Sequence, residues 1–183
     1  MIVEKVEEAG YKSALKGLAL NKKKNAKDMI TVAEKLSPYD YGHNKFLESI
    51  YVWLEVSAPR YIWSEMDTYR ISTKQSQSTM HTLIKDLTVD YVELRKLFEC
   101  DVSEELIQRL VSLAKSDKLM ELKSILPEGF IQKRMWCMSY KCLRNIYIQR
   151  MKHRLPHWQM FIEQTYKQVD HPELLPTPSF LSR

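Results

Sequence analysis

Glycine and cysteine are both scarce in this chain of 183 residues. Its four glycines are scattered, which excludes a glycine-rich phosphate loop and a dinucleotide-binding fingerprint. A bound nucleotide would therefore be held by side chains and ordinary backbone amides. The three cysteines, Cys100, Cys137 and Cys142, are too few for a disulfide scaffold and fit a reducing compartment.

The chain also lacks long apolar runs and a recognisable targeting segment. No stretch approaches the roughly 20 apolar residues that cross a bilayer. The first residues, Met1–Lys5, are not a basic segment followed by an apolar one, so no secretory signal is evident. We expect a soluble, cytoplasmic protein without a membrane partner.

Charge alone does not decide the class of partner. A net charge of +5 and a pI of about 9.0 suit a nucleic acid and an anionic small substrate equally well. The only basic run, Lys22–Lys24, predicts a solvated helix start rather than a recognition patch, so a nucleic acid partner is not expected. Hydrophobic residues make up 44% and charged residues 28%, and the length fits a single domain over residues 1–183 with a loose tail from about residue 176.

The hydrophobic spacing predicts a helix-rich α+β fold. Helices are expected over Ala26–Leu36, from Pro59 toward Met66, over His81–Phe98, from a cap at Asp101–Glu105 through Ala114, and over Leu119–Ile125, Ser139–Met151 and Trp158–Val169. Strands are expected over Ile50–Val56 and Phe130–Met138. The segment Arg70–Met80 is rich in hydroxyl and amide groups and has little apolar periodicity, which predicts a loop presenting hydrogen-bond donors.

Three short segments of the chain, taken together, form a pattern of order and spacing. The first is Gly42–Ser49, which leads into the predicted strand and then Pro59; the second is Thr68-Tyr69-Arg70, seven residues, then Ser78. The third comprises Leu126-Pro127, Trp136, and Asn145 followed five residues later by Arg150. In order and spacing they resemble the flavin-dependent thymidylate synthases, whose hallmark is Arg-His-Arg, seven residues, then Ser.

The resemblance implies an antiparallel sheet flanked by helices, the fold of the thymidylate-synthase-complementing proteins. It implies a homotetramer with active sites between chains and reductive methylation of dUMP, a pyrimidine deoxynucleotide, at C5. FAD would be the cofactor, with methylenetetrahydrofolate and NADPH as co-substrates. No enzyme nucleophile attacks the pyrimidine in this chemistry, so a catalytic cysteine is not required.

Residue roles follow from the matched positions. Arg150 matches the arginine that hydrogen-bonds the pyrimidine ring, and is the catalytic candidate. The substrate-binding candidates are Glu65, Arg70, Ser76, Gln77, Ser78, Lys123 and Arg150, with Ser78, Lys123 and the amides near Gln77 and Thr79 placed for the phosphate. The cofactor-binding candidates are Ser49, Tyr51, Thr68, Tyr69, Arg70, Ser139 and Asn145.

Several positions depart from the family pattern. Thr68 and Tyr69 replace the hallmark Arg and His, Ser49 replaces a His, Ser76 replaces a Glu, and Glu65 stands where a Gln is usual. These changes keep two alternatives open. One is altered pyrimidine nucleotide specificity, for dCMP, UMP or a hydroxymethyl product. The other is a non-catalytic nucleotide-binding or assembly protein that has lost flavin.

The sequence also contains a weak zinc-like pattern. Cys137 and Cys142 precede His153 and His157 at nearly the spacing of a zinc finger. The cysteines lack a glycine knuckle and Pro156 interrupts the histidine pair, so buried free thiols are expected and no metal.

Some candidate residues also have ordinary structural interpretations. Ser76 and Ser78 fit a turn or a helix cap before His81. Core packing rather than ligand stacking is expected for the aromatic residues Tyr51, Trp53, Tyr61, Trp63 and Trp136.

Overall fold

The computed structural model describes residues 1–21, 23 and 25–180. Two residues of the Lys22–Lys24 run therefore lie outside the described residues. So do residues 181–183 of the expected loose tail. By its internal contacts the chain divides into two compact units. Unit 1 comprises Met1–Val56, Tyr69–Lys74 and Met135–Arg183, and unit 2 comprises Ser57–Thr68 and Gln75–Arg134.

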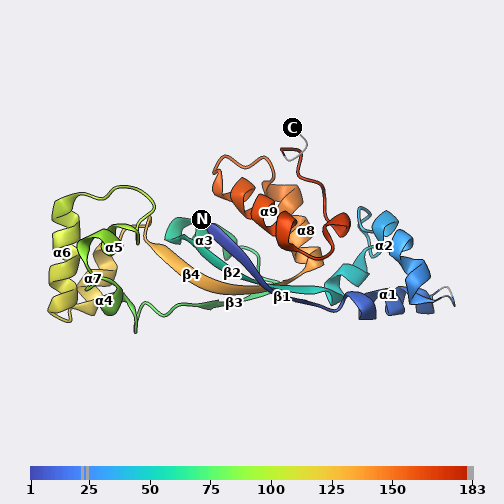
Figure 1. Ribbon diagram of the computed structural model, residues 1–183, viewed down its shortest axis with the longest axis horizontal. Coiled ribbons are helices and arrows are strands. Elements are labelled where there is room, and N and C mark those ends of the chain that lie inside the picture. Colours follow the sequence, from blue (N-terminus) through green and yellow to red (C-terminus); the bar gives the residue numbers. More distant parts are fainter. Residues whose placement is uncertain (22, 24, 181–183) are drawn as a thin grey trace. The chain divides into compact units, whose positions relative to one another are not determined.

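Four strands form one antiparallel sheet in the order β1-β2-β4-β3 (Figure 1). They are β1 (Ile2–Ala9), β2 (Tyr51–Pro59), β3 (Ser72–Ser76) and β4 (Ile131–Ser139). In the central strand β2, Val52, Leu54 and Val56 are fully buried and alternate with residues that stay partly exposed. This alternation follows the period of two along a strand. The α+β fold is confirmed, and so are the two predicted strands, which correspond to β2 and β4.

Unit 1 contains α-helices and short 3-10 helices. They are α1 (Tyr11–Leu20), η1 (Ala26–Met29), α2 (Ile30–Leu36), η2 (Lys45–Ser49), α8 (Tyr140–Arg150), α9 (His157–Gln168) and η3 (Pro172–Leu174). The side chain of Ser139 caps α8 by accepting the Cys142 amide, which fixes where the helix begins. Helix α9 packs against both α8 and β1 and buries Trp158 and Phe161 completely (Figure 1). Helices α8 and α9 confirm two predicted helices.

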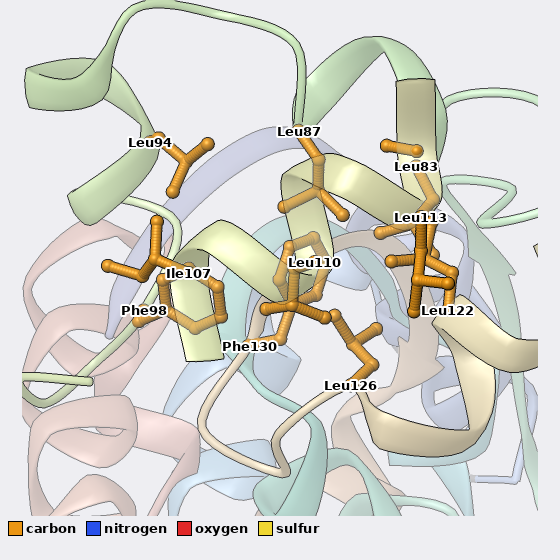
Figure 2. Close-up of a cluster of buried hydrophobic side chains, with 11 residues drawn as sticks. Leu83, Leu87, Leu94, Phe98, Ile107, Leu110, Leu113, Leu122, Leu126 and Phe130 are labelled. Carbon is orange, nitrogen blue, oxygen red and sulfur yellow. The ribbon is translucent and has the colours of Figure 1, made fainter. Parts of the chain in front are cut away.

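Unit 2 has an apolar core of its own. Its helices are α3 (Arg60–Met66), α4 (Leu83–Asp86), α5 (Tyr91–Arg95), α6 (Glu104–Lys115) and α7 (Leu119–Ile125). Leu87, Leu110 and Leu122 are fully buried there, with Phe98 and Phe130 in edge-to-face contact (Figure 2). Helices α3, α6 and α7 confirm their predictions, and most of this core comes from the 3.6-residue spacing noted in the sequence.

Two expectations about these elements are wrong. The segment Arg70–Met80, predicted as a loop, contains strand β3. This strand lies at the edge of the sheet, where polar side chains are tolerated, so its sequence shows no apolar periodicity. The predicted helix His81–Phe98 is two short helices, because the Asp90 side chain accepts the amides of Val92 and Glu93 and so starts a new helix.

The helix expected over Ala26–Leu36 is confirmed, with its first turn in the 3-10 form (η1) before α2. Strand β1 and helix α1 were not predicted at all. No helix among the described residues combines the length and the apolar character that a bilayer span needs.

Candidate functional site

Tyr69 and Arg150 lie against each other in unit 1. Tyr69 stands between α3 and β3, and Arg150 is the last residue of α8. The Nε of Arg150 donates to the Tyr69 hydroxyl over 2.9 Å, although 81 residues separate them. That hydroxyl in turn donates to the Gln149 side-chain oxygen over 3.0 Å. The fold thus joins the hallmark-like segment to the Asn145–Arg150 segment.

Two tryptophans form an aromatic wall beside this pair. The guanidinium carbon of Arg150 lies 4.7 Å from the centre of the Trp158 ring. The Tyr69 ring meets Trp158 edge-on at 5.9 Å and Trp136 at 6.5 Å between ring centres. Both tryptophans are fully buried and Tyr69 is 9% exposed. An arginine over a desolvated aromatic face is held more strongly than one in water, so the guanidinium has a defined orientation.

A second cation reaches the same wall from β3. The Nζ of Lys74 lies 4.9 Å from the Trp136 ring centre and donates to the Tyr69 carbonyl over 3.1 Å. The Ser72 hydroxyl donates to that carbonyl over 2.6 Å. Burial raises the pKa of the nearby Cys142 thiol more than the Lys74 charge lowers it, so this cysteine stays a neutral thiol. The expectation of an inert buried thiol holds for Cys142.

The structure places one further cofactor candidate, Ser49, at a hollow of unit 1. Ser49, at the end of η2, lines a cavity of about 640 Å³ together with polar groups of Asn21, His43 and Lys45. Tyr51 follows on β2 with 43% of its surface exposed. Core packing was expected for both Tyr51 and Trp136. It is confirmed for Trp136, which is fully buried, and wrong for Tyr51.

The other cofactor candidates differ in how available their polar groups are. Arg70 is exposed, and Asn145 is half-buried on α8. The Ser139 hydroxyl is buried and accepts the Cys142 amide at 3.2 Å, so it already serves as a helix cap. In unit 2 the Thr68 hydroxyl donates to the backbone carbonyl of Glu65 over 2.7 Å.

The phosphate candidates lie in unit 2 at the end of β3. The Gln77 amide donates to the Lys133 carbonyl over 2.9 Å, and the Gln77 carbonyl accepts from the Gln132 side chain. The Gln77 amide is therefore used by the sheet and is not available to an anion. The Ser78 carbonyl accepts the amides of His81 and Thr82 at 3.0 Å, which makes a turn.

Lys123 approaches this turn from α7. Its exposed Nζ lies 3.5 Å from the sulfur of Met80, two residues after Ser78. Nothing in the sequence spacing required Lys123 to lie near Met80. The contact brings a cation to the turn that contains the half-buried Ser78 and Thr79. Glu65 is half-buried on α3 and Ser76 is exposed at the end of β3.

A buried arginine anchors the segment before Gly42. Arg144 is 5% exposed and donates to the Asp40 carboxylate over 3.2 Å and to the Pro38 carbonyl over 2.5 Å. Lys141 also pairs with Asp40 at 3.2 Å. The hydrogen bond from Lys141 and the charge of Arg144 hold the pKa of the Asp40 carboxyl below its usual range. This network fixes the start of the segment that leads to His43.

Sequence reasoning missed Gln149, Trp158 and Lys74. Gln149 adjoins the matched Arg150, which was the one available signal, whereas Trp158 and Lys74 reach the pair only through the fold. Of the zinc-like pattern, Cys142 and His157 are buried and Cys137 and His153 half-buried. Across the described part of the chain, no three His, Cys, Asp or Glu side chains converge as metal ligands.

Comparison with known proteins gives a structural likeness only. No family model matches the chain, and no curated protein matches it significantly. Among solved structures, thymidylate synthase X of Helicobacter pylori with FAD and dUMP is similar at a TM-score of 0.80 and 16% identity, over 96% of this chain and 97% of that one. A second structure of this flavin-dependent enzyme with FAD and dUMP gives a TM-score of 0.77 and 16% identity, over 96% and 98%. This chain therefore has the fold of the flavin-dependent thymidylate synthases.

Proposed function

We propose that this protein is a flavin-dependent thymidylate synthase-like enzyme, which methylates C5 of dUMP reductively. FAD would be its cofactor, and methylenetetrahydrofolate and NADPH its co-substrates. The observation that supports this most is the contact between Arg150 and Tyr69, which joins two of the motifs behind the resemblance. The same fold in H. pylori is solved with FAD and dUMP, which supports a flavin and a pyrimidine deoxynucleotide here.

Arg150 is the residue we assign to the pyrimidine base. Its planar guanidinium offers paired donors that match the carbonyl oxygens of uracil. The aromatic wall of Trp158 keeps it in one orientation. An oriented donor pair lowers the entropic cost of holding C5 toward the reacting carbon.

The turn at Ser78 and the cation of Lys123 are the groups we assign to the phosphate. The hydroxyls of Ser78 and Thr79 supply donors, and Lys123 supplies a charge beside Met80. Glu65, Ser76 and Gln77 complete the proposed substrate set. The backbone amide of Gln77 is used by β4, so Gln77 would contribute through its side chain, whose nitrogen here donates to Thr82 and Asp86.

Most of the residues that we assign to FAD belong to unit 1. The exposed guanidinium of Arg70 suits a diphosphate, and Ser49 offers a hydroxyl at a cavity of about 640 Å³. The partly exposed ring of Tyr51 would offer a stacking surface. Thr68, Tyr69, Ser139 and Asn145 are assigned to the same cofactor. Bound FAD would supply the hydride for the reductive step. The homotetramer with sites between chains and the cytoplasmic location belong to this proposal as well.

The first experiment is a visible absorption spectrum of the purified protein, followed by denaturation and identification of the released flavin. We expect FAD at about one per chain and formation of dTMP from dUMP when both co-substrates are added. A colourless protein that takes up no added FAD and forms no product would contradict the proposal. Thermal shifts with dUMP, dCMP and UMP then test the base and the sugar, with dUMP expected to stabilise most.

A further inference from the structure

Gln132 and Arg134 lie two residues apart on β4, so their side chains project from the same face of the strand. The Gln132 side-chain oxygen accepts hydrogen bonds from Nε and Nη2 of Arg134, at 3.2 and 2.9 Å. The Nη1 of Arg134 donates to both carboxylate oxygens of Asp67, at 3.2 and 3.1 Å. Each guanidinium nitrogen therefore has a partner, and Asp67 balances the charge of Arg134.

The guanidinium of Arg134 is also held against an aromatic ring. Its carbon lies 4.5 Å from the centre of the Trp63 ring on α3, and Asp67 directly follows that helix. The Trp63 ring nitrogen donates to the Gln132 carbonyl over 2.9 Å. The Arg134 side chain is 17% exposed and Gln132 is 8% exposed. Side chains packed in this way have little rotamer freedom, so the fold fixes their orientation.

The arginine determines which way the Gln132 side-chain amide faces. A guanidinium has only donors, so the amide oxygen must face it and the amide nitrogen must point away. That nitrogen donates to the Gln77 carbonyl over 3.1 Å. The Gln77 amide donates to the Lys133 carbonyl over 2.9 Å, so β4 fixes both backbone groups of Gln77. We call Asp67, Arg134, Gln132 and Gln77 the Arg134 network.

The Arg134 network ends where the turn that we assign to the phosphate begins. Ser78 follows Gln77 directly, and its carbonyl accepts the amides of His81 and Thr82, both at 3.0 Å. The network and this turn all belong to unit 2. Fixing the residue before the turn limits where the Ser78 hydroxyl can lie. A donor that is already in place binds an anion more tightly than one that must first be ordered.

We infer that Arg134 is a positioning residue for the phosphate of the nucleotide: it orients Gln132, which holds Gln77 and so sets the place of the Ser78 turn. The inference rests on the proposed function, in which this turn binds the phosphate of dUMP. Arg134 acts through Gln132 and not on the nucleotide, because its nitrogens are engaged within the network. None of the motifs behind the resemblance includes Asp67, Gln132 or Arg134.

The test compares dUMP with deoxyuridine, which has no phosphate, in calorimetric titrations of the whole chain. Arg134→Lys keeps the charge beside Trp63 but loses the planar fork that joins Asp67 to Gln132. We expect it to weaken dUMP binding about three- to tenfold, because the phosphate donors are no longer held in place, and to leave deoxyuridine binding unchanged. Gln132→Met has a similar length without the amide, and we expect the same result.

Arg60→Lys is the matched control in unit 2. Arg60 donates to the Leu126 carbonyl over 3.0 Å and pairs with Glu128 at 3.2 Å. This variant also loses a guanidinium that joins two partners, but neither partner belongs to the Arg134 network. We therefore expect it to bind dUMP and deoxyuridine like the wild type. An equal loss of affinity for both ligands in Arg134→Lys would assign Arg134 a merely structural role and overturn the inference.

Hydrogen exchange reports on the turn without any ligand. The two amides that donate to the Ser78 carbonyl should exchange about threefold faster or more in Arg134→Lys and Gln132→Met than in the wild type and Arg60→Lys. Unchanged exchange would overturn the inference. A wild type that binds dUMP, with both network variants binding it equally well, overturns the positioning role alone. A wild type that does not bind dUMP overturns the proposed function and the positioning role together.

Discussion

The guanidinium carbon of Arg150 lies 4.7 Å above the ring of Trp158, a residue that is fully buried in unit 1. Trp158 is on α9 and Arg150 ends α8, so the packing of these two helices sets the contact. A half-buried arginine on an aromatic face keeps its charge at the surface while its orientation is fixed. This is the arrangement that a base-reading residue needs.

Replacing Arg150 by alanine tests the assignment of the base. We expect Arg150→Ala to weaken dUMP binding about 10- to 100-fold, because paired charge-assisted hydrogen bonds are lost. The free energy of unfolding should fall by about 1–2 kcal/mol at most, since the side chain is only partly buried. Calorimetric titration and denaturant melts measure both effects. Arg154→Ala, at an exposed neighbouring position, is the control, and a dUMP affinity within twofold of wild type in Arg150→Ala would remove this residue from the site.

Replacing Lys123 by alanine tests the assignment of the phosphate. We expect Lys123→Ala to weaken dUMP binding about three- to tenfold and to leave deoxyuridine, which has no phosphate, unaffected. The dUMP difference should shrink as salt is added, because the lysine is exposed. Lys118→Ala, at the start of the same helix, is the control. Equal effects on dUMP and deoxyuridine would contradict a phosphate contact.

The elements that the sequence predicts correctly have one property in common. Each is rich in apolar residues: in α6 and α9 these repeat at the period of a helix, and β2 and β4 contain runs of apolar and aromatic residues. Strand β1 was missed because Val3 is its only buried residue and charged residues occupy much of the rest. Strand β3 was missed for a similar reason, since backbone pairing with β4 defines it and its side chains do not.

The site shows a comparable division. Motif spacing led to Arg150, Ser78 and Lys123, but their roles stay predictions. The approach of Lys123 to Met80 and of Arg150 to Tyr69 depends on tertiary packing, which no local pattern encodes. Hydrophobic periodicity also does not predict where a capping residue interrupts a helix. Asp90 caps the start of α5 and so divides the helix predicted over His81–Phe98.

A pair of glycine substitutions tests the packing of unit 1. Gly10 has a φ of 98° and a Cβ there would overlap the Ser49 carbonyl oxygen, whereas a Cβ on Gly17 in α1 meets nothing within 4 Å. We expect Gly10→Ala to lower the free energy of unfolding by roughly 4 kcal/mol or more, through backbone strain and overlap. Gly17→Ala should raise it by about 1 kcal/mol, as in other helix interiors. Urea melts decide this, and a Gly10→Ala protein as stable as wild type would contradict the close approach.

The Asp40 network gives a pH dependence of known sign. The pKa of the folded-state carboxyl lies below the ordinary value of about 3.9, because Lys141 donates to it and Arg144 is close. Asp40 thus contributes stability that is fully present above about pH 4 and is lost as the pH falls through the lower folded-state pKa. We expect Asp40→Asn to be less stable than wild type at pH 7, with the difference shrinking below pH 4. Urea midpoints from pH 7 to pH 2.5 measure it, and a constant difference across that range would contradict the linkage.

The contact of Gly10 with the Ser49 carbonyl also bears on how this fold diverges. Side chains that touch a ligand can be exchanged when the ligand or its binding mode changes. Two backbone segments that meet where no Cβ fits allow no such exchange, whatever the protein binds. Among proteins with this fold, a glycine between β1 and α1 should therefore be retained even where the ligand-binding residues differ. That glycine would identify a shared fold in chains whose binding residues have little in common.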